Sequence, residues 1–255
     1  MKFKILGCSG GIGGKRRTTS FILDDSVLID CGTGVGDLTF SAMLKISDVF
    51  LTHSHQDHIC MLPMLADAIG ENLDRTLKVH ALPQTVDFIK THIFNNRVWP
   101  DYTKLPRVEA PWVRFIPLEV GETILLHDAA KITALAARHS VPAIGYLLDS
   151  GNTCLAFSGD TTYCKAFWQT LGACENLSHV IIENTFLCAN VEGARRSGHM
   201  TAQLLVRGLE QLKKKPFIHI SHLDANFESA IMREIKVFAK IWHPMQLHNG
   251  DVIDF

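Results

Sequence analysis

The chain has 255 residues, of which 47% are hydrophobic and 20% are charged, so it has the composition of a folded protein that can bury a large core. Its formal net charge of -1 excludes a global basic field for nucleic acid and favours a small or locally held ligand. The 7 cysteines include no Cys-x-x-Cys pair, and no apolar run approaches the ~20 residues that span a membrane, so we expect a cytoplasmic protein without a disulfide framework.

The first predicted strand, residues 3–6, leads into a glycine-rich loop at residues 7–14. Glycine lets the backbone approach a ligand closely, and the basic residues that follow, Arg16 and Arg17 among them, could hold an anion. The alternative, that the glycines only turn the chain, stays open.

A predicted hairpin over residues 21–29 ends in Asp30, a carboxylate that needs a partner if it is buried. Residues 37–45 have helical periodicity, and the apolar run at residues 49–51 predicts the next strand. Asp30 is thus the first of several polar residues that directly follow a predicted strand.

Three histidines and an aspartate follow the strand at residues 49–51 within a short loop: His53, His55, Asp57 and His58. Neutral imidazoles and a carboxylate are ligands for a borderline divalent metal, with zinc the first choice. A solvated polar loop would be the alternative, but it requires four potential ligands to fall together by accident. Cys60 lies nearby and is expected to be a small core residue.

Beyond the cluster, apolar residues at helical spacing predict a helix over residues 59–69, and a strand and a helix are predicted at 77–81 and 86–94. The loop at residues 95–106, which contains Arg97 and Trp99, is a candidate lid over a pocket. A structural loop anchored by Trp99 is an equal alternative. The alternation over residues 113–126 predicts a β-hairpin.

In the second half, predicted strands again end in polar residues: His139, Asp160, Glu183 and His222 each follow an apolar run. A polar stretch at residues 190–198 precedes His199, and helices are predicted over 203–212 and 228–238. This alternation predicts α/β layers with one site at the strand ends, in a single domain over residues 1–255.

The ordered series Asp30, the cluster at residues 53–58, His139, Asp160 and His222 resembles the metallo-β-lactamase superfamily, whose fold is a four-layer αββα sandwich. The resemblance implies a dinuclear site: His53, His55 and His139 on the first metal, Asp57, His58 and His222 on the second, and Asp160 bridging them. The resemblance also implies that Asp30 does not bind a metal itself but orients the ligands. The metals would be zinc, or else manganese or iron. The remaining histidines are expected to have ordinary roles: His80, His92, His127, His179, His219, His243 and His248.

Two features of the resemblance point to phosphodiesters. Glu183 and His199 resemble the glutamate–histidine pair of the tRNase Z branch, in which a carboxylate supports the imidazolium as a general acid. The glycine-rich opening, the residues after Asp57 and the Asn95–Asn96 to Trp99–Pro100 segment look closest to the bacterial class II 3′,5′-cyclic-nucleotide phosphodiesterases.

The resemblance therefore implies a metal-dependent hydrolase that cleaves a 3′,5′-cyclic nucleotide, such as cyclic AMP, to a nucleoside 5′-monophosphate. A hydroxide bridging the metals would attack phosphorus, and Asp57, His199 and Glu183 are the expected catalytic residues. The candidate substrate contacts are Arg16, Arg17, Arg97 and Trp99.

Three rivals remain open: a tRNase Z-like 3′ RNA-processing endonuclease, a metal-dependent ester, thioester or lactone hydrolase, and a metal-bearing ligand sensor without catalysis. The expected partner is a small phosphodiester, with no membrane and with nucleic acid disfavoured by the charge. The oligomeric state is open, a homodimer being one option.

Overall fold

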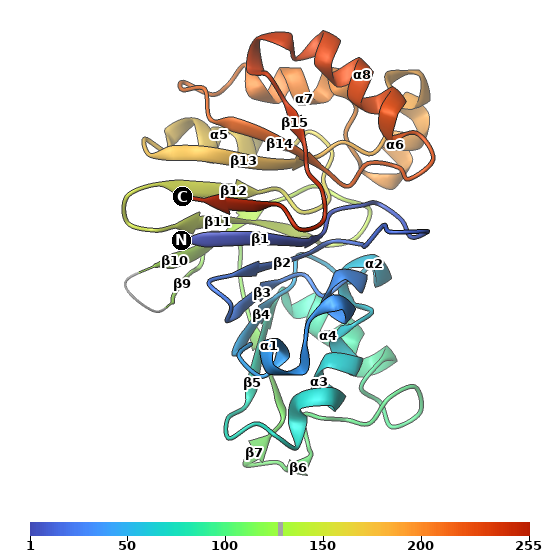
Figure 1. Cartoon of the computed structure of the whole chain (residues 1–255), viewed down its shortest axis with the longest axis vertical. Helices are drawn as coiled ribbons and strands as arrows, with labels where there is room; N and C mark the ends of the chain where they lie inside the picture. Colours follow the sequence, from blue (N-terminus) through green and yellow to red (C-terminus); the bar gives the residue numbers. More distant parts are fainter. Residues whose placement is uncertain (127–129) are drawn as a thin grey trace. The chain divides into compact units, whose positions relative to one another are not determined.

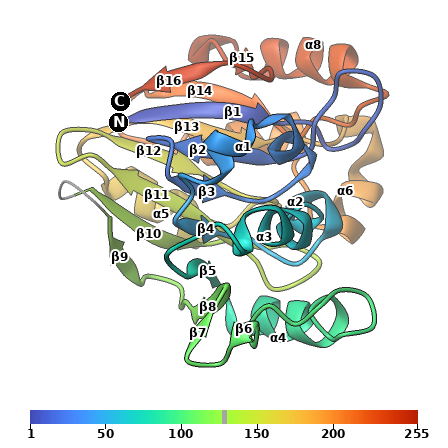
Figure 2. The same cartoon turned by 60° about the horizontal axis from the view of Figure 1, so that its bottom comes forward.

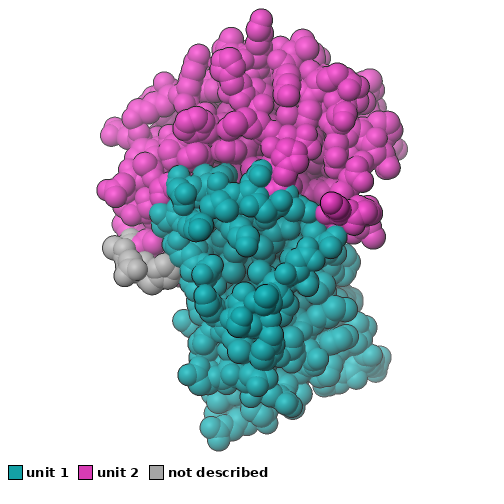
Figure 3. Space-filling view, in the orientation of Figure 1, with its two compact units in different colours: residues 1–7, 17–119, 249–254 teal, residues 8–16, 120–248, 255 magenta. Residues whose placement is uncertain are grey.

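A computed structural model describes residues 1–126 and 130–255, so His127 lies outside the described residues. The chain divides into two compact units, coloured in Figure 3. The first comprises residues 1–7, 17–119 and 249–254, and the second comprises residues 8–16, 120–248 and 255. The single domain over residues 1–255 stays a prediction.

The first unit is built on one sheet, whose strand order can be followed in Figure 2: β16 (Val252–Asp254), β1 (Lys2–Gly7), β2 (Ser20–Leu23), β3 (Val27–Ile29), β4 (Asp48–Phe50), β5 (Leu77–Ala81) and β8 (Val113–Pro117). The pairs from β16 to β3 are antiparallel, and those from β3 to β8 are parallel. Because β3 and β4 are parallel, the residues that follow them emerge at the same edge of the sheet.

The helical elements of this unit are η1 (Thr33–Asp37), α1 (Phe40–Met43), α2 (Gln56–Ile59), α3 (Leu62–Gly70) and α4 (Pro83–His92). Leu65 and Ile69 of α3 pack in one apolar cluster with Val49 and Val79 of the sheet. Fully burying one such side chain contributes roughly 1.5–3 kcal/mol. This packing anchors the loop that carries the histidine cluster.

The helix predicted over residues 37–45 is shorter than expected, because η1 ends at Asp37 and α1 covers only Phe40–Met43. Leu38 is extended, with a ψ of 143°, so η1 ends before it. Thr39 then caps α1 by accepting a hydrogen bond from the Ala42 amide. A threonine in this role starts a new helix rather than continuing the old one.

The hairpin predicted over residues 113–126 is wrong. β8 pairs with β5, whereas β9 (Thr123–Leu125) pairs with β10 in the other unit. Alternating apolar residues predict a strand but do not identify its partner. The short strands β6 (Pro106–Arg107) and β7 (Ala110–Pro111) pair separately, and Trp99 in the loop before them packs against the apolar cluster of the first unit.

The sheet of the second unit has, within the described residues, this order: β15 (Met245–Gln246), β14 (Phe217–Ser221), β13 (Leu177–Glu183), β12 (Cys154–Phe157), β11 (Ile144–Asp149), β10 (Lys131–Ala136) and β9. β12 to β15 run parallel, and β9 to β12 pair antiparallel. β10, β12, β13 and β14 therefore share one direction.

Figure 1 labels the helices α5 (Lys165–Ala173), α6 (Val191–Ser197), α7 (Ala202–Leu209) and α8 (Glu228–Phe238) of the second unit. The same unit contains the short 3-10 helices η3 (Cys188–Asn190) and η4 (Lys240–Trp242). α7 and α8 bury Leu205 and Ile235 in one cluster with Val180 and Ile218 of the sheet. Among the residues that the structure describes, every helix is too short or too polar to cross a bilayer.

Two helices of this unit were not predicted. α5 buries Phe167 and Trp168 against the same cluster. α6 lies in the stretch at residues 190–198, for which the sequence indicates only a polar segment. Asn190 caps this helix, and Ala194 is its one buried residue. A helix this exposed has almost no apolar periodicity by which to recognise it.

Candidate metal and catalytic site

The candidate residues of the first unit follow the carboxyl ends of β3 and β4. Asp30 comes directly after β3, and Thr52 and His53 follow β4. The Asp30 amide donates to the Phe50 carbonyl at 2.9 Å, which holds the two strand ends together. The parallel pairing thus brings Asp30 to the histidine cluster, as the sequence predicted.

Asp30 is fully buried and accepts three kinds of hydrogen bond. The Thr52 amide donates to Oδ1 at 2.8 Å, the Thr52 hydroxyl lies 2.8 Å from Oδ2, and His58 Nδ1 donates to Oδ2 at 2.7 Å. Burial raises the pKa of Asp30, while the charge and hydrogen bond of His58 oppose that rise. Asp30 also has a φ of 55°, a strained conformation that persists only where its surroundings enforce it.

These contacts fix which ring nitrogen of each histidine can bind a metal. The Thr52 hydroxyl lies 3.0 Å from His53 Nδ1, and His58 Nδ1 is bound to Asp30. With Nδ1 engaged, Nε2 is the nitrogen of both rings that would coordinate an ion. His58 Nε2 lies 3.6 Å from Asp57 Oδ2, and the His53 ring lies 4.7 Å from the His55 ring, centroid to centroid.

The candidate ligands of the second unit follow β10, β12 and β14: His139, Asp160 and His222. One carboxylate oxygen, Asp160 Oδ2, lies 3.9 Å from His139 Nε2 and 3.3 Å from His222 Nε2. Ligand atoms on one tetrahedral zinc, with bonds of about 2.0–2.1 Å, lie about 3.3 Å apart. The distance to His222 Nε2 matches this spacing, and the distance to His139 Nε2 is longer.

His139 is oriented by the end of α6. Its Nδ1 donates to the Gly198 carbonyl at 3.1 Å, so its Nε2 faces Asp160. Gly198 has a φ of 75°, and a Cβ there would lie 2.9 Å from the His139 backbone. Only glycine allows this approach without strain, a requirement that the sequence analysis missed.

The structure brings Glu183 and His199 together, as predicted. His199 Nδ1 donates to Glu183 Oε1 at 2.7 Å, and Glu183 is fully buried. The amides of Thr161, Thr185 and Met200 also donate to this carboxylate, at 3.0, 3.1 and 3.3 Å. These donors hold the carboxylate in one orientation.

Thr185 is a further site residue that the sequence analysis missed. Its hydroxyl lies 3.0 Å from Glu183 Oε2, 3.2 Å from His199 Nδ1 and 3.0 Å from His222 Nδ1. It therefore links the Glu183–His199 pair to a candidate metal ligand. Side chains two apart on an extended segment share a face, so its position two residues after Glu183 was the available signal.

The glycine-rich loop meets the site through Gly10. The His222 amide donates to the Cys8 carbonyl at 2.7 Å, and a Cβ on Gly10 would lie 3.0 Å from His222 Nδ1. Glycine at this position lets the loop pass close to the imidazole.

The predicted substrate contacts have structural partners, and their roles stay predictions. Arg16 pairs with Glu228 at 2.9 Å, and Arg17 pairs with Asp37 at 2.8 Å. Arg97 is exposed in the loop at residues 95–106, whose role as a lid also stays a prediction.

Burial and the neighbouring Asp57 carboxylate raise the pKa of the Cys60 thiol, which favours its protonated form.

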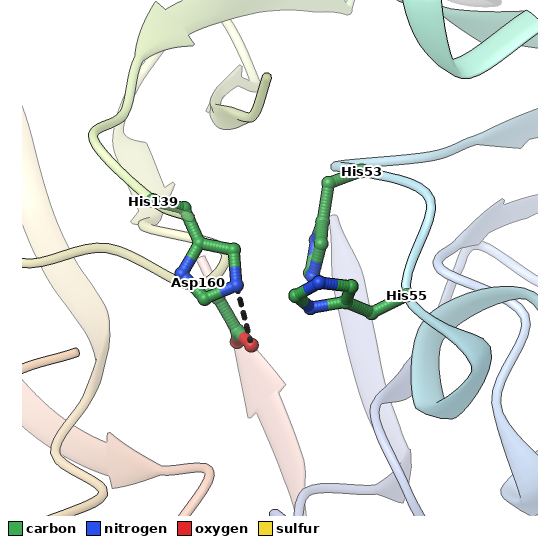
Figure 4. A group of neighbouring side chains, drawn as sticks. All are labelled: His53, His55, His139 and Asp160. Carbon is green, nitrogen blue, oxygen red and sulfur yellow. Dashed lines mark ion pairs between the residues drawn. The ribbon is translucent and has the colours of Figure 1, made fainter. Parts of the chain in front are cut away.

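Two groups of side chains among the described residues could each hold a metal ion. They are His53, His55, His139 and Asp160, and Asp57, His58, Asp160 and His222. Figure 4 draws the first group and marks the contact between His139 and Asp160. The imidazole and carboxylate donors suit zinc and its neighbours in the first transition row.

Comparison with known proteins identifies the family. The family described as "Beta-lactamase superfamily domain" matches residues 25–221. Ribonuclease Z of Haloarcula marismortui is 28% identical over 156 residues, which are 58% of this chain and 47% of that protein. A probable 3′,5′-cyclic-nucleotide phosphodiesterase of Yersinia pestis is 26% identical over 211 residues, 72% of this chain and 59% of that protein. The chain thus covers less than two thirds of the length of either relative.

The solved structure of unliganded yeast PDE1 has a TM-score of 0.83 at 16% identity, and the match covers 100% of this chain and 99% of that one. The chain belongs to the metallo-β-lactamase superfamily, and the predicted α/β fold class, the αββα sandwich of that superfamily, is confirmed.

Proposed function

We propose that the two groups of ligands bind two divalent metal ions, zinc being the first choice. His53, His55 and His139 would hold one ion, Asp57, His58 and His222 the other, and Asp160 would bind both. The proposal is supported by the donor types, by the hydrogen bonds that direct Nε2 of His53, His58 and His139, and by the position of Asp160 Oδ2 relative to His139 and His222.

On this basis the chain is an enzyme that hydrolyses phosphodiesters, with 3′,5′-cyclic nucleotides as the substrate class. The observation that carries the proposal is the 2.7 Å hydrogen bond between His199 and the buried Glu183. Breaking a phosphodiester at an alkoxide oxygen requires a proton donor, which an imidazolium supported by a carboxylate supplies. Hydrolysis of a lactone or thioester would leave this pair without a role.

In this reaction Glu183 would orient His199, and His199 would donate a proton to the leaving oxygen. Bound metal ions would neutralise charge at the phosphate and lower the pKa of water. Because Glu183 engages Nδ1 of His199, Nε2 carries the proton that passes to the 3′ oxygen as the bond to phosphorus breaks. Water supplies the oxygen that remains on phosphorus, so the product is a nucleoside 5′-monophosphate with a free 3′ hydroxyl.

A tRNase Z-like nuclease is the second candidate, favoured by the similarity to Ribonuclease Z. It would use the same metals and the same His199. The formal net charge of -1 favours a small substrate over a long polyanion. A similarity to a named cyclic-nucleotide phosphodiesterase over 72% of this chain supports the first candidate.

His199→Ala tests the catalytic pair. We expect it to retain its metal and to lose ~10²–10⁴-fold in turnover of cyclic AMP, whose leaving oxygen needs a proton. Turnover of bis(4-nitrophenyl) phosphate, whose leaving group needs none, should fall far less. His92→Ala, at an exposed position on α4, is the control. An equal loss on both substrates would contradict the acid role.

A further inference from the structure

The second unit contains a basic cavity that adjoins the candidate metal ligand His139, which lines it together with Gly198. It has a volume of about 450 Å³ and is lined by residues from the loop after β10, from α6 and from α7. Four arginines contribute to it: Arg138, Arg195, Arg196 and Arg207. Tyr163, Thr162 and Ser140 add hydroxyl groups, and no carboxylate among the described residues lines the cavity.

The arginines of this cavity are poorly neutralised. Arg195 pairs with Glu192 at 3.1 Å, but both side chains are largely exposed, at 73% and 69%, so the pair is weak. Within residues 1–126 and 130–255, no carboxylate forms an ion pair with Arg138, Arg196 or Arg207. These four arginines are exposed around one cavity, and an anion bound among them would reduce the repulsion between their charges.

Two of these arginines, Arg207 and Arg138, are held in place by contacts with neighbouring residues. The guanidinium of Arg207 lies over the Tyr163 ring at 4.1 Å from the centroid. Stacking occupies the face of the guanidinium and leaves the donors in its plane for a ligand. The Arg138 amide donates to Thr161 Oγ1 at 2.9 Å, and its carbonyl accepts from the Thr162 amide at 2.8 Å, so the backbone that carries Arg138 is fixed.

The size of the cavity indicates the kind of ligand. About 450 Å³ exceeds the volume of an inorganic anion and falls in the range of pockets for small organic molecules. Arginine forks match the oxygens of phosphate groups, and the Tyr163 ring and Leu204 give the cavity an apolar surface as well.

We propose that this cavity, beside the candidate metal ligand His139, binds a phosphorylated small molecule of nucleotide size through the guanidinium groups of Arg138, Arg196 and Arg207. The site needs neither bound metal nor hydrolysis. Adenosine 5′-monophosphate, which is also the product of the proposed reaction, is therefore titrated into metal-free protein, so that binding by the arginines is measured apart from the proposed phosphodiesterase activity.

Isothermal titration with adenosine 5′-monophosphate tests the site, with unphosphorylated adenosine and citrate as comparison ligands at equal ionic strength. Arg196→Gln combined with Arg207→Gln should weaken nucleotide binding by about tenfold per arginine. Arg233→Gln, at an exposed position on α8, is the control.

The variants' thermal unfolding is measured alongside, so that a folding defect is recognised; Arg196→Lys keeps the charge and gives a second readout if the double variant is unstable. Adenosine should not bind and citrate should bind weakly. Nucleotide affinity that stays within twofold of wild type in the folded double variant would overturn the site. Citrate binding as tightly as the nucleotide would overturn its assignment to phosphate.

Discussion

Two threonine hydroxyls have matching positions in the two units. Thr52 Oγ1 contacts the buried Asp30 carboxylate and the Nδ1 atoms of His53 and His58, the latter at 3.4 Å. Thr185 Oγ1 contacts a buried carboxylate and two histidines in the same way. Such partners set the tautomer and orientation of metal-binding histidines, and their loss typically costs 10–100-fold in metal affinity or activity.

Thr185→Val keeps the shape of the side chain and removes the hydroxyl. We expect metal affinity to fall about 10–100-fold, because His222 loses the partner of its Nδ1. Thr185→Ser should restore most of the affinity. Competition with a chromogenic chelator measures it, and Thr170→Val, on the exposed face of α5, is the control. Metal affinity equal to that of the wild type would refute the role of Thr185.

Asp160→Ala removes the carboxylate proposed to bind both ions. We expect the purified variant to lose metal as well as activity, since its Oδ2 is the oxygen nearest the Nε2 atoms of His139 and His222. Elemental analysis of the folded protein measures the loss, with the exposed Asp87→Ala as the control. Full metal occupancy in the variant would exclude the bridging role.

The sequence predicted the individual ligand candidates because each follows an apolar strand. It also paired Glu183 with His199, which lie 2.7 Å apart. It missed Thr52, Thr185 and Gly198, whose importance comes from contacts with residues distant in the chain or, for Gly198, from a close backbone approach. A threonine or a glycine in a loop has many ordinary explanations, so residue type alone does not reveal such roles.

At the scale of elements, strands were easier to predict than their partners. The runs that form β4, β12 and β14 are apolar over several residues, as buried parallel strands are. The separation of β8 from β9 could not be predicted, since alternation is the same in a hairpin and in two strands of different sheets. α6 was missed because its exposed sequence lacks apolar periodicity.

A hydrogen bond between β4 and β5 leads to a prediction about the pH dependence of stability. Asp48 at the start of β4 accepts from His80 of β5 at 2.8 Å and from Ser47 at 2.8 Å. Burial by itself raises the pKa of Asp48, but these hydrogen bonds outweigh it and hold that pKa below its usual value. The ionised carboxylate therefore stabilises the fold above the pKa of the unfolded chain, near 3.9, and this contribution is lost as the pH falls through the lower, folded pKa.

Asp48→Asn should thus reduce the free energy of unfolding by about 1 kcal/mol at pH 6, with the difference from wild type shrinking as the pH falls below about 4. Urea unfolding at each pH measures it. Asp74→Asn, whose side chain is 93% exposed, is the control and should change little. A difference that grows as the pH falls would contradict the sign of the pKa shift.

At the scale of the whole molecule, the superfamily defines the fold and leaves the substrate to the site. The two relatives are named for substrates of very different size, an RNA and a cyclic nucleotide. The near-neutral charge favours the smaller one. The two substrates share a leaving 3′ oxygen, so the His199 variant alone does not separate them.

Product analysis with the metal-loaded protein tests the central claim most directly. The protein is incubated with 3′,5′-cyclic AMP and, in parallel, with a precursor tRNA, and a chelator-treated sample is the control. We predict metal-dependent conversion of cyclic AMP to adenosine 5′-monophosphate, with little or no cleavage of the tRNA. Cleavage of the tRNA at its 3′ end, with cyclic AMP left intact, would contradict this account and assign the chain to RNA processing.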